Sequence, residues 1–133
     1  MDVYLSEGAL LFLKAQALET SGKTRSGLLL GHRRGQRFFV EQAYPSGART
    51  IFSERTYWAL DRLFSGKIIG FYSFTSRGRR APEILKPFAY GKVFLQILLR
   101  PKNRWTIRPH LIEFKDSFVL LPIPLYSRSK GKK

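Results

Sequence analysis

The sequence contains two histidines, His32 and His110, and no cysteine, so zinc chemistry would have to begin with these two side chains. Catalytic zinc is usually held by three His or carboxylate ligands. Neither histidine has a second one within a few residues, and this spacing favours two structural histidines. A composite site made of both histidines and a carboxylate stays open as an alternative. Without cysteine the chain offers no disulfide, thiolate nucleophile or cysteine-bound metal, and we predict no metal and no cofactor.

Serine catalysis and phosphate binding also lack their usual motifs. No Gly-x-Ser-x-Gly elbow occurs, the turn that exposes the nucleophile of many serine hydrolases. The segment Ser21–Thr24 contains Gly-Lys-Thr but lacks the earlier glycine and the preceding strand of a phosphate-binding loop, so we expect a turn that ends a helix. The nine acidic residues are scattered, and no carboxylate pair is set up for acid–base catalysis.

The strong basic charge is the clearest pointer to a partner. The chain carries 24 lysines and arginines against 9 aspartates and glutamates, a formal net charge of +15. Such an excess attracts nucleic acid and other polyanions, acidic proteins or anionic lipid headgroups. The basic residues predicted to bind a ligand are Arg33, Arg34, Arg77, Arg79, Arg80, Lys86 and Arg104. The alternative for the loop 77–80 is a solvated charge run without a ligand.

Aromatic side chains could add base stacking to this charge, because single strands bind basic grooves that carry exposed rings. The candidates are Tyr72, Phe74 and Trp105, although we expect Trp105 to pack in the core.

Length and composition fit one domain, which we place at residues 1–126, with a basic disordered tail at 127–133. The apolar run Gly8–Leu13 is short and follows acidic residues, unlike a secretory signal. No stretch reaches the roughly 20 apolar residues of a membrane span. These features predict a cytoplasmic protein without a membrane span.

Two helices are expected to position these side chains. Ser6 suits the N-cap of the first helix, which ends at Ser21-Gly22. Its apolar stripe consists of Ala9, Leu10, Leu13 and Ala17, widened by Leu11, Ala15 and Leu18. A second helix begins at Ser53 and ends at Gly66, and its buried face consists of Tyr57, Leu60 and Phe64.

Apolar runs bounded by glycine, proline and polar residues predict the strands. They lie at Val3–Leu5, Ser26–His32, Arg37–Ala43, Lys67–Phe74, Lys92–Leu99, Arg104–Phe114 and Ser117–Leu121. The segment Ala81–Ala89 could hold a short helix that Pro87 would end or kink, and the chain is expected to loosen from Pro122. This order predicts a mixed α/β domain with a single sheet and two main helices.

Two of the predicted strands resemble the motif strands of a known family. Ser26–Gly31 (Ser-Gly-Leu-Leu-Leu-Gly) follows the first helix, and Ile68–Phe74 (Ile-Ile-Gly-Phe-Tyr-Ser-Phe) comes later. With this order of elements, residues 3–121 resemble the JAMM/MPN domain, the fold of zinc-dependent deubiquitinases and related isopeptidases. The resemblance implies a cytidine-deaminase-like architecture. In that family two His and an Asp hold zinc, and a Glu acts on the zinc-bound water.

Carried over position by position, the resemblance implies that the catalytic residues are replaced. Thr24 stands at the Glu position, and Tyr72 and Phe74 stand at the two His positions. Ser73 keeps the residue of the family between two aromatic side chains that would fill or line the vacated cleft. Aromatic carbon cannot bind zinc, and a phenol is a poor substitute for imidazole.

The family's later Ser-x-x-Asp motif falls near Pro82 and Leu85, so the third zinc ligand is missing as well. The resemblance therefore implies a pseudo-enzyme without metal that serves as a protein-interaction or scaffold module. Its partner would be a protein, such as another JAMM/MPN-like or a ubiquitin-like protein.

Two other interpretations remain beside this one. The charge supports a basic nucleic-acid-binding module that uses the arginine-rich loops. A divergent hydrolase built around Ser73 or His32 ranks last, because neither residue has a visible base or orienting acid.

Overall fold

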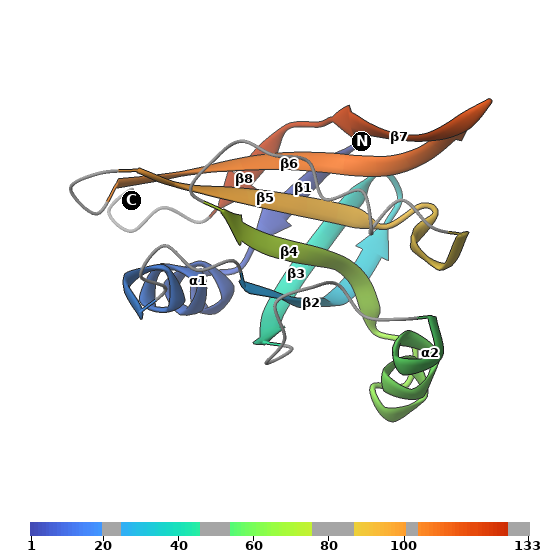
Figure 1. Ribbon diagram of the computed structural model, residues 1–133, viewed down its shortest axis with the longest axis horizontal. Helices are drawn as coiled ribbons and strands as arrows, with labels where there is room; N and C mark the ends of the chain where they lie inside the picture. Colours follow the sequence, from blue (N-terminus) through green and yellow to red (C-terminus); the bar gives the residue numbers. More distant parts are fainter. Residues whose placement is uncertain (20–24, 46–53, 76–86, 101–103, 128–133) are drawn as a thin grey trace.

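The computed structural model describes residues 1–19, 25–45, 54–75, 87–100 and 104–127, in which one eight-stranded sheet has the order β7-β6-β5-β4-β2-β3-β1-β8 (Figure 1). The elements are β1 (Asp2–Leu5), α1 (Glu7–Glu19), β2 (Arg25–Arg34), β3 (Arg37–Pro45), α2 (Glu54–Leu63), β4 (Ile68–Thr75), the 3-10 helix η2 (Pro87–Ala89), β5 (Val93–Arg100), β6 (Arg104–Lys115), β7 (Ser117–Pro122) and β8 (Leu125–Ser127). The predicted mixed α/β domain with a single sheet and two main helices is confirmed.

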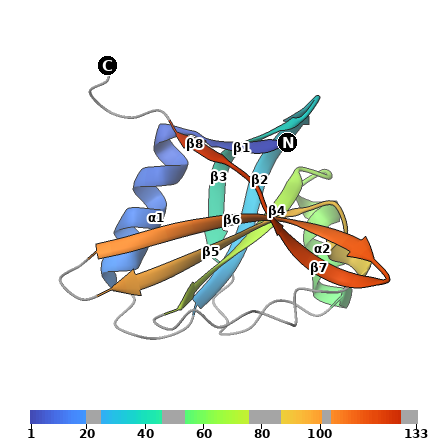
Figure 2. The same ribbon diagram turned by 90° about the horizontal axis from the view of Figure 1, so that it is seen from above.

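The sheet is curled and separates two hydrophobic cores. Side chains alternate along a strand, and in β2 Leu29 packs on the α1 side whereas Leu28 and Leu30 pack on the α2 side. The α1-side core also joins β1 and β3 to β5 and β6, which are not neighbours in the sheet. Figure 2 shows α1 and α2 at opposite ends of the molecule, with the strands between them.

Helix α1 begins as its sequence predicts. The backbone N–H of Ala9 donates to the hydroxyl of Ser6 at 3.0 Å, which caps the first turn. Ala9 and Leu13 are buried. The predicted widening of the stripe is wrong, because Leu11 and Leu18 are 53% and 68% exposed on the side away from the core.

Strands β4 and β5 run parallel, with Gly70 opposite Val93. Parallel strands start at the same edge of a sheet, so the turn between α2 and β4 lies beside the turn between η2 and β5. A lysine ends each turn, Lys67 before β4 and Lys92 before β5. This edge carries the groove described below.

Two local predictions concern prolines. Pro87 is the first residue of η2, a position where proline's missing N–H costs nothing; residues 81–86 of the short helix that Pro87 was predicted to end or kink lie outside the described residues. The second prediction is wrong. The chain does not loosen after Pro122, since β8 pairs in parallel with β1, with Val3 opposite Leu125. The remainder of the predicted tail, residues 128–133, lies outside the described residues.

Candidate functional site

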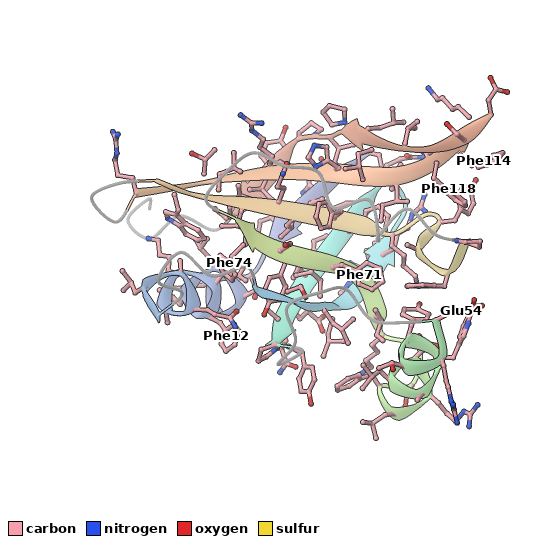
Figure 3. All side chains as sticks on the ribbon, viewed as in Figure 1. Phe12, Glu54, Phe71, Phe74, Phe114 and Phe118 are labelled. Atoms are coloured by element: carbon pink, nitrogen blue, oxygen red, sulfur yellow. The ribbon has the colours of Figure 1, made fainter. Side chains whose placement is uncertain are left out.

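The strand that resembles the zinc-binding motif is β4, and its aromatic side chains are buried. Tyr72 and Phe74 have no exposed surface and both pack in the α1-side core. Their ring centroids are 5.6 Å apart, with the rings edge to face at 82°. Figure 3 shows Phe74 near α1 and Phe71 of the same strand nearer α2. The two residues for which the resemblance expects histidines therefore fill the core and do not line a cleft.

A hydrogen bond from α1 fixes the tyrosine. The hydroxyl of Tyr72 donates to Gln16 Oε1 at 2.7 Å. Burial raises the pKa of Tyr72 well above its ordinary value, and the hydrogen bond to Gln16 opposes this only in part. The phenol therefore stays protonated, and Phe74 has no donor atom at all. We call Tyr72, Phe74 and Gln16 the aromatic seal; these side chains do not fit a zinc ion.

A glycine of β2 makes room for this seal. A Cβ atom on Gly27 would lie 2.6 Å from the ring of Tyr72 and 2.4 Å from the backbone oxygen of Tyr44. Side chains cannot approach this closely without displacement. The first glycine of the Gly-Leu-Leu-Leu-Gly segment is therefore needed for the close packing of β2 against the Tyr72 ring.

Ser73 points away from the seal and lies in a buried polar row. Ser26 of β2 and Gln96 of β5 are its partners in the sheet register. All three are almost fully buried. Neither neighbour is a general base, so the structure gives no support to a serine nucleophile here.

The other positions of the predicted site are only partly described. Thr24, Pro82, Leu85, Arg77, Arg79, Arg80 and Lys86 all lie outside the described residues. Arg33 and Arg34 end β2 and are exposed, and Arg104 is exposed at the start of β6. Arg104 is opposite Arg100, at the far end of β5 from Lys92. The structure therefore does not bring Arg104 together with the hairpin arginines.

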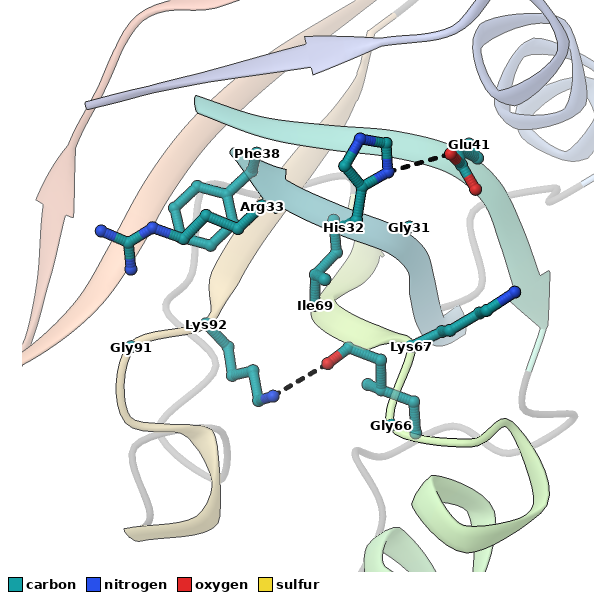
Figure 4. A pocket seen from close by; sticks show the side chains of 11 residues that line it. Gly31, His32, Arg33, Phe38, Glu41, Gly66, Lys67, Ile69, Gly91 and Lys92 are labelled. Atoms are coloured by element: carbon teal, nitrogen blue, oxygen red, sulfur yellow. Dashed lines mark hydrogen bonds and ion pairs between the residues drawn. The ribbon is translucent and has the colours of Figure 1, made fainter. Parts of the chain in front are cut away.

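A groove of about 500 Å³ lies between the β2–β3 hairpin and the two lysine turns (Figure 4). Its charged lining consists of Arg33, Lys67 and Lys92, with His32 beside Glu41. We call these five residues the basic groove. The lining has three permanent cations and one carboxylate, so it favours an anionic ligand.

Each lysine follows a glycine in a left-handed conformation. Gly66 has φ 74° and Gly91 has φ 78°, a region that other residues adopt at a cost. The turn N–H groups are already used: Gly66 donates to Asp61, and Gly91 donates to Ile112. The N–H groups of the two lysines also donate to backbone oxygens. The turns therefore offer their side chains, and not their backbone, to a ligand.

Lys92 is held in place within the groove. Its Nζ donates to the backbone oxygen of Ile68 at 2.8 Å and lies 6.0 Å from the ring centroid of Tyr57. Burial lowers the pKa of Lys92, and the nearby carboxylate of Asp61 opposes this shift. Of the three ammonium donors, one is satisfied within the described part of the chain, and no described residue accepts a hydrogen bond from the other two.

The opposite wall is built on aromatic rings. His32 Nδ1 lies 3.0 Å from Glu41 Oε2, and the imidazole stacks on Phe39 with centroids 5.1 Å apart. The guanidinium of Arg33 lies 5.1 Å from the ring centroid of Phe38. One oxygen of Glu41 thus contacts His32, and among the described residues no ion pair joins Glu41 to a lysine or arginine of the groove.

Lys67 and Lys92 are not among the predicted binding residues, although the sequence contains a signal for them. Gly-Lys followed by an apolar strand occurs twice, at residues 66–69 and 91–94. A repeated glycine–lysine step before apolar strands could have indicated two turns with the same geometry. It could not have shown that the two turns are neighbours, because that depends on the parallel pairing of β4 and β5.

The two histidines belong to different elements of the sheet. His32 lies in the groove, whereas His110 lies in β6 with its ring stacked near Phe94, centroids 6.3 Å apart. Among the described residues no three His, Asp or Glu side chains gather as a metal site. Within the same residues no helix has the length and apolar character needed to cross a membrane.

Comparison with known proteins supports the fold alone. No family model and no curated protein matches the sequence. The chain is similar to the solution structure of a structural genomics target from Desulfitobacterium hafniense, with 20% sequence identity and a TM-score of 0.66. The match covers 98% of this chain and 97% of that one. The fold as a whole, from β1 to β8, is therefore shared with another solved protein.

Proposed function

We propose that the chain is a catalytically inactive JAMM/MPN-like domain that acts in the cytoplasm as a protein-interaction or scaffold module. The observation that supports this most is the aromatic seal. Tyr72 and Phe74 stand at the positions where the resemblance expects zinc-binding histidines, and both are buried in the core. The one polar atom of the pair is hydrogen-bonded to Gln16.

The seal is a structural alternative to a metal centre. In a zinc enzyme of this kind, the strand would need imidazole nitrogens next to a water-accessible space. Here the same strand contributes rings to a close-packed core, and Gly27 leaves just enough room for one of them. A domain that keeps such a frame without the chemistry would serve by binding, with a JAMM/MPN-like or ubiquitin-like protein as its expected partner.

Metal content tests the first half of this proposal. The full chain, purified without chelators and dialysed against metal-free buffer, is expected to contain far less than one zinc per molecule by plasma mass spectrometry. A Tyr72→Phe variant serves as control and should give the same value, because the phenol is not a ligand. Stoichiometric zinc in the wild-type protein would overturn the proposal.

Partner binding tests the second half. Purified chain is mixed with a candidate JAMM/MPN-like or ubiquitin-like protein, and complex mass is measured by light scattering at low and at high salt. A protein partner held through packed surfaces should survive high salt, whereas a purely electrostatic complex should dissociate. Loss of every stoichiometric protein complex at high salt would contradict the scaffold role.

A second candidate is a nucleic-acid-binding module, which the net charge of +15 and the basic groove favour. It predicts binding to oligonucleotides that weakens steeply with salt, since each phosphate contact releases counterions. A flat salt dependence, or undetectable affinity at low salt, would exclude it. The two functions are compatible, because the groove and the rest of the surface could serve different partners.

A further inference from the structure

The cations of the basic groove are spread along it and do not converge on one point. In Figure 4, Lys92 reaches into the middle, while the side chains of Arg33 and Lys67 extend toward the two ends. A second hollow of about 330 Å³ shares Gly31, Glu41 and Lys67 with the groove and extends it toward the end of α2. An elongated cationic surface of this kind matches a chain of charges better than a single anion.

We propose that the basic groove binds the sugar–phosphate backbone of single-stranded nucleic acid, with Arg33, Lys92 and Lys67 contacting successive phosphates. The inference rests on the second candidate function and names its site; it is independent of the JAMM/MPN-like proposal. Basic grooves that follow a strand, with rings available for stacking, are the general form of such sites.

His32 supplies the ring. Its imidazole is stacked on Phe39 at an interplanar angle of 17°, and its side chain is 50% exposed. An aromatic ring supported from behind and open in front can stack against a base, and this contact tolerates any base. The groove therefore combines cations for phosphates with one platform for a base, which an acidic peptide would not use.

Binding here must depend on side chains. The N–H groups of Gly66, Lys67, Gly91 and Lys92 all donate to backbone oxygens within the protein. No helix N-terminus lines this groove among the described residues. Neutralising the lysines should therefore remove the contacts, because no backbone donor from these turns remains to replace them.

The side chain of Lys92 is already held in position before a ligand binds. Its ammonium is partly desolvated and already hydrogen-bonded to Ile68, so binding orders little that is not ordered beforehand. Asp61 of α2 and Glu41 of β3 are the acidic groups near the lysine and in the groove, and Glu41 is engaged by His32.

The test is a fluorescence anisotropy titration of the full chain with a short labelled single-stranded oligonucleotide of mixed sequence. The groove variant is Lys67→Gln with Lys92→Gln. The matched control is Arg55→Gln with Lys115→Gln, two exposed basic residues outside the groove with the same change in charge. Circular dichroism melting checks that each variant is folded.

The groove variant should bind at least about tenfold more weakly, and its slope of log affinity against log salt should fall by about 1.4, about 0.7 for each lost phosphate contact. The control should change affinity less than about twofold. Lys92→Arg keeps the charge and should retain binding. If Lys92→Gln fails to fold, Lys92→Arg still tests whether a positive charge at this position is enough for binding.

Three outcomes would overturn the proposal. Equal losses in the groove variant and the control would assign binding to net charge; the nucleic-acid function would then stand and the groove would not be its site. Tighter binding of inorganic pyrophosphate than of the oligonucleotide would indicate a small-anion site. Equal affinity for a polyglutamate peptide, with His32→Ala having no effect on oligonucleotide binding, would indicate unselective attraction of anions.

Discussion

The two ends of strand β4 differ in every property that matters for function. Its later part carries Tyr72 and Phe74, which are uncharged and fully buried, and the hydroxyl of Tyr72 donates a hydrogen bond to Gln16 of α1. Its start follows Lys67 and opens into a groove with three cations. The resemblance to a zinc enzyme directs attention to the sealed end. The accessible charged groups are at the open end, so the segment that resembles a family motif is not the segment with the most accessible charge.

Removing the seal should have the largest effect. Tyr72→Ala is expected to lower the free energy of unfolding by about 3–5 kcal/mol, the usual cost of deleting a buried aromatic ring. Tyr72→Phe should cost only about 1–2 kcal/mol, because it removes the part-buried hydrogen bond to Gln16 but keeps the ring. Urea unfolding measures both. A cost below about 1 kcal/mol for Tyr72→Ala would mean that the ring does not fill a core.

Adding a methyl group beside the aromatic seal should cause the second-largest loss of stability. Gly27→Ala places a methyl group against Tyr72 and the backbone of Tyr44, and about 1–3 kcal/mol of stability should be lost. Gly8→Ala is the matched control, because nothing lies within 4 Å of its added Cβ and alanine favours helices. The control should be neutral or slightly more stable in the same unfolding experiment. Equal losses in both variants would remove the steric argument.

Alkaline pH should lower the stability of the fold through its two buried tyrosines. Burial raises the pKa of Tyr57 to about 12 and also raises the pKa of Tyr72, from an ordinary value of 10.0. Above pH 10 the unfolded chain has lost phenol protons that the folded chain keeps, so stability is full below pH 10 and falls as pH rises further. Absorbance titration should show that Tyr57 and Tyr72 ionise at a higher pH in the folded chain than in the unfolded chain. Six tyrosines titrating together in a folded protein would contradict this.

The titration of Lys92 should change the stability with pH by a smaller amount and in the opposite direction. Its pKa is lowered from 10.5 by burial, so the unfolded chain binds more protons as pH approaches 10.5 from below. Stability therefore rises with pH in that window, relative to a Lys92→Gln variant, which lacks the titrating group. Matched denaturation curves of the two proteins measure the difference. A difference that stays constant, or that falls with pH, would show that the lysine is not desolvated in the groove.

Local patterns predicted much of the fold, and contacts between distant segments account for what was missed. The Ser6 cap and the stripe of Ala9 and Leu13 follow from short-range rules and are confirmed. The widening to Leu11 and Leu18 is wrong, because an apolar residue on a helix does not itself show which side meets the core.

In the candidate site, too, local patterns predicted one part and contacts between distant segments determined the rest. The sequence placed Tyr72 and Phe74 at a motif position but left open whether they fill or line a cleft; their burial decides that they fill it. The groove depends on two turns that are neighbours only because β4 and β5 pair in parallel. No pattern within either segment contains that pairing, so Lys67 and Lys92 were missed.

The pairing of β8 with β1 has a consequence for folding order. It joins Val3 to Leu125, so forming it closes a loop that includes nearly all of the described chain. The entropy lost in such a closure grows with loop length, and contacts of long sequence separation slow folding. We expect this short parallel edge to be the last part of the sheet to form and the first to open. The two ends of the described chain would then pair with each other only after the rest of the domain has folded.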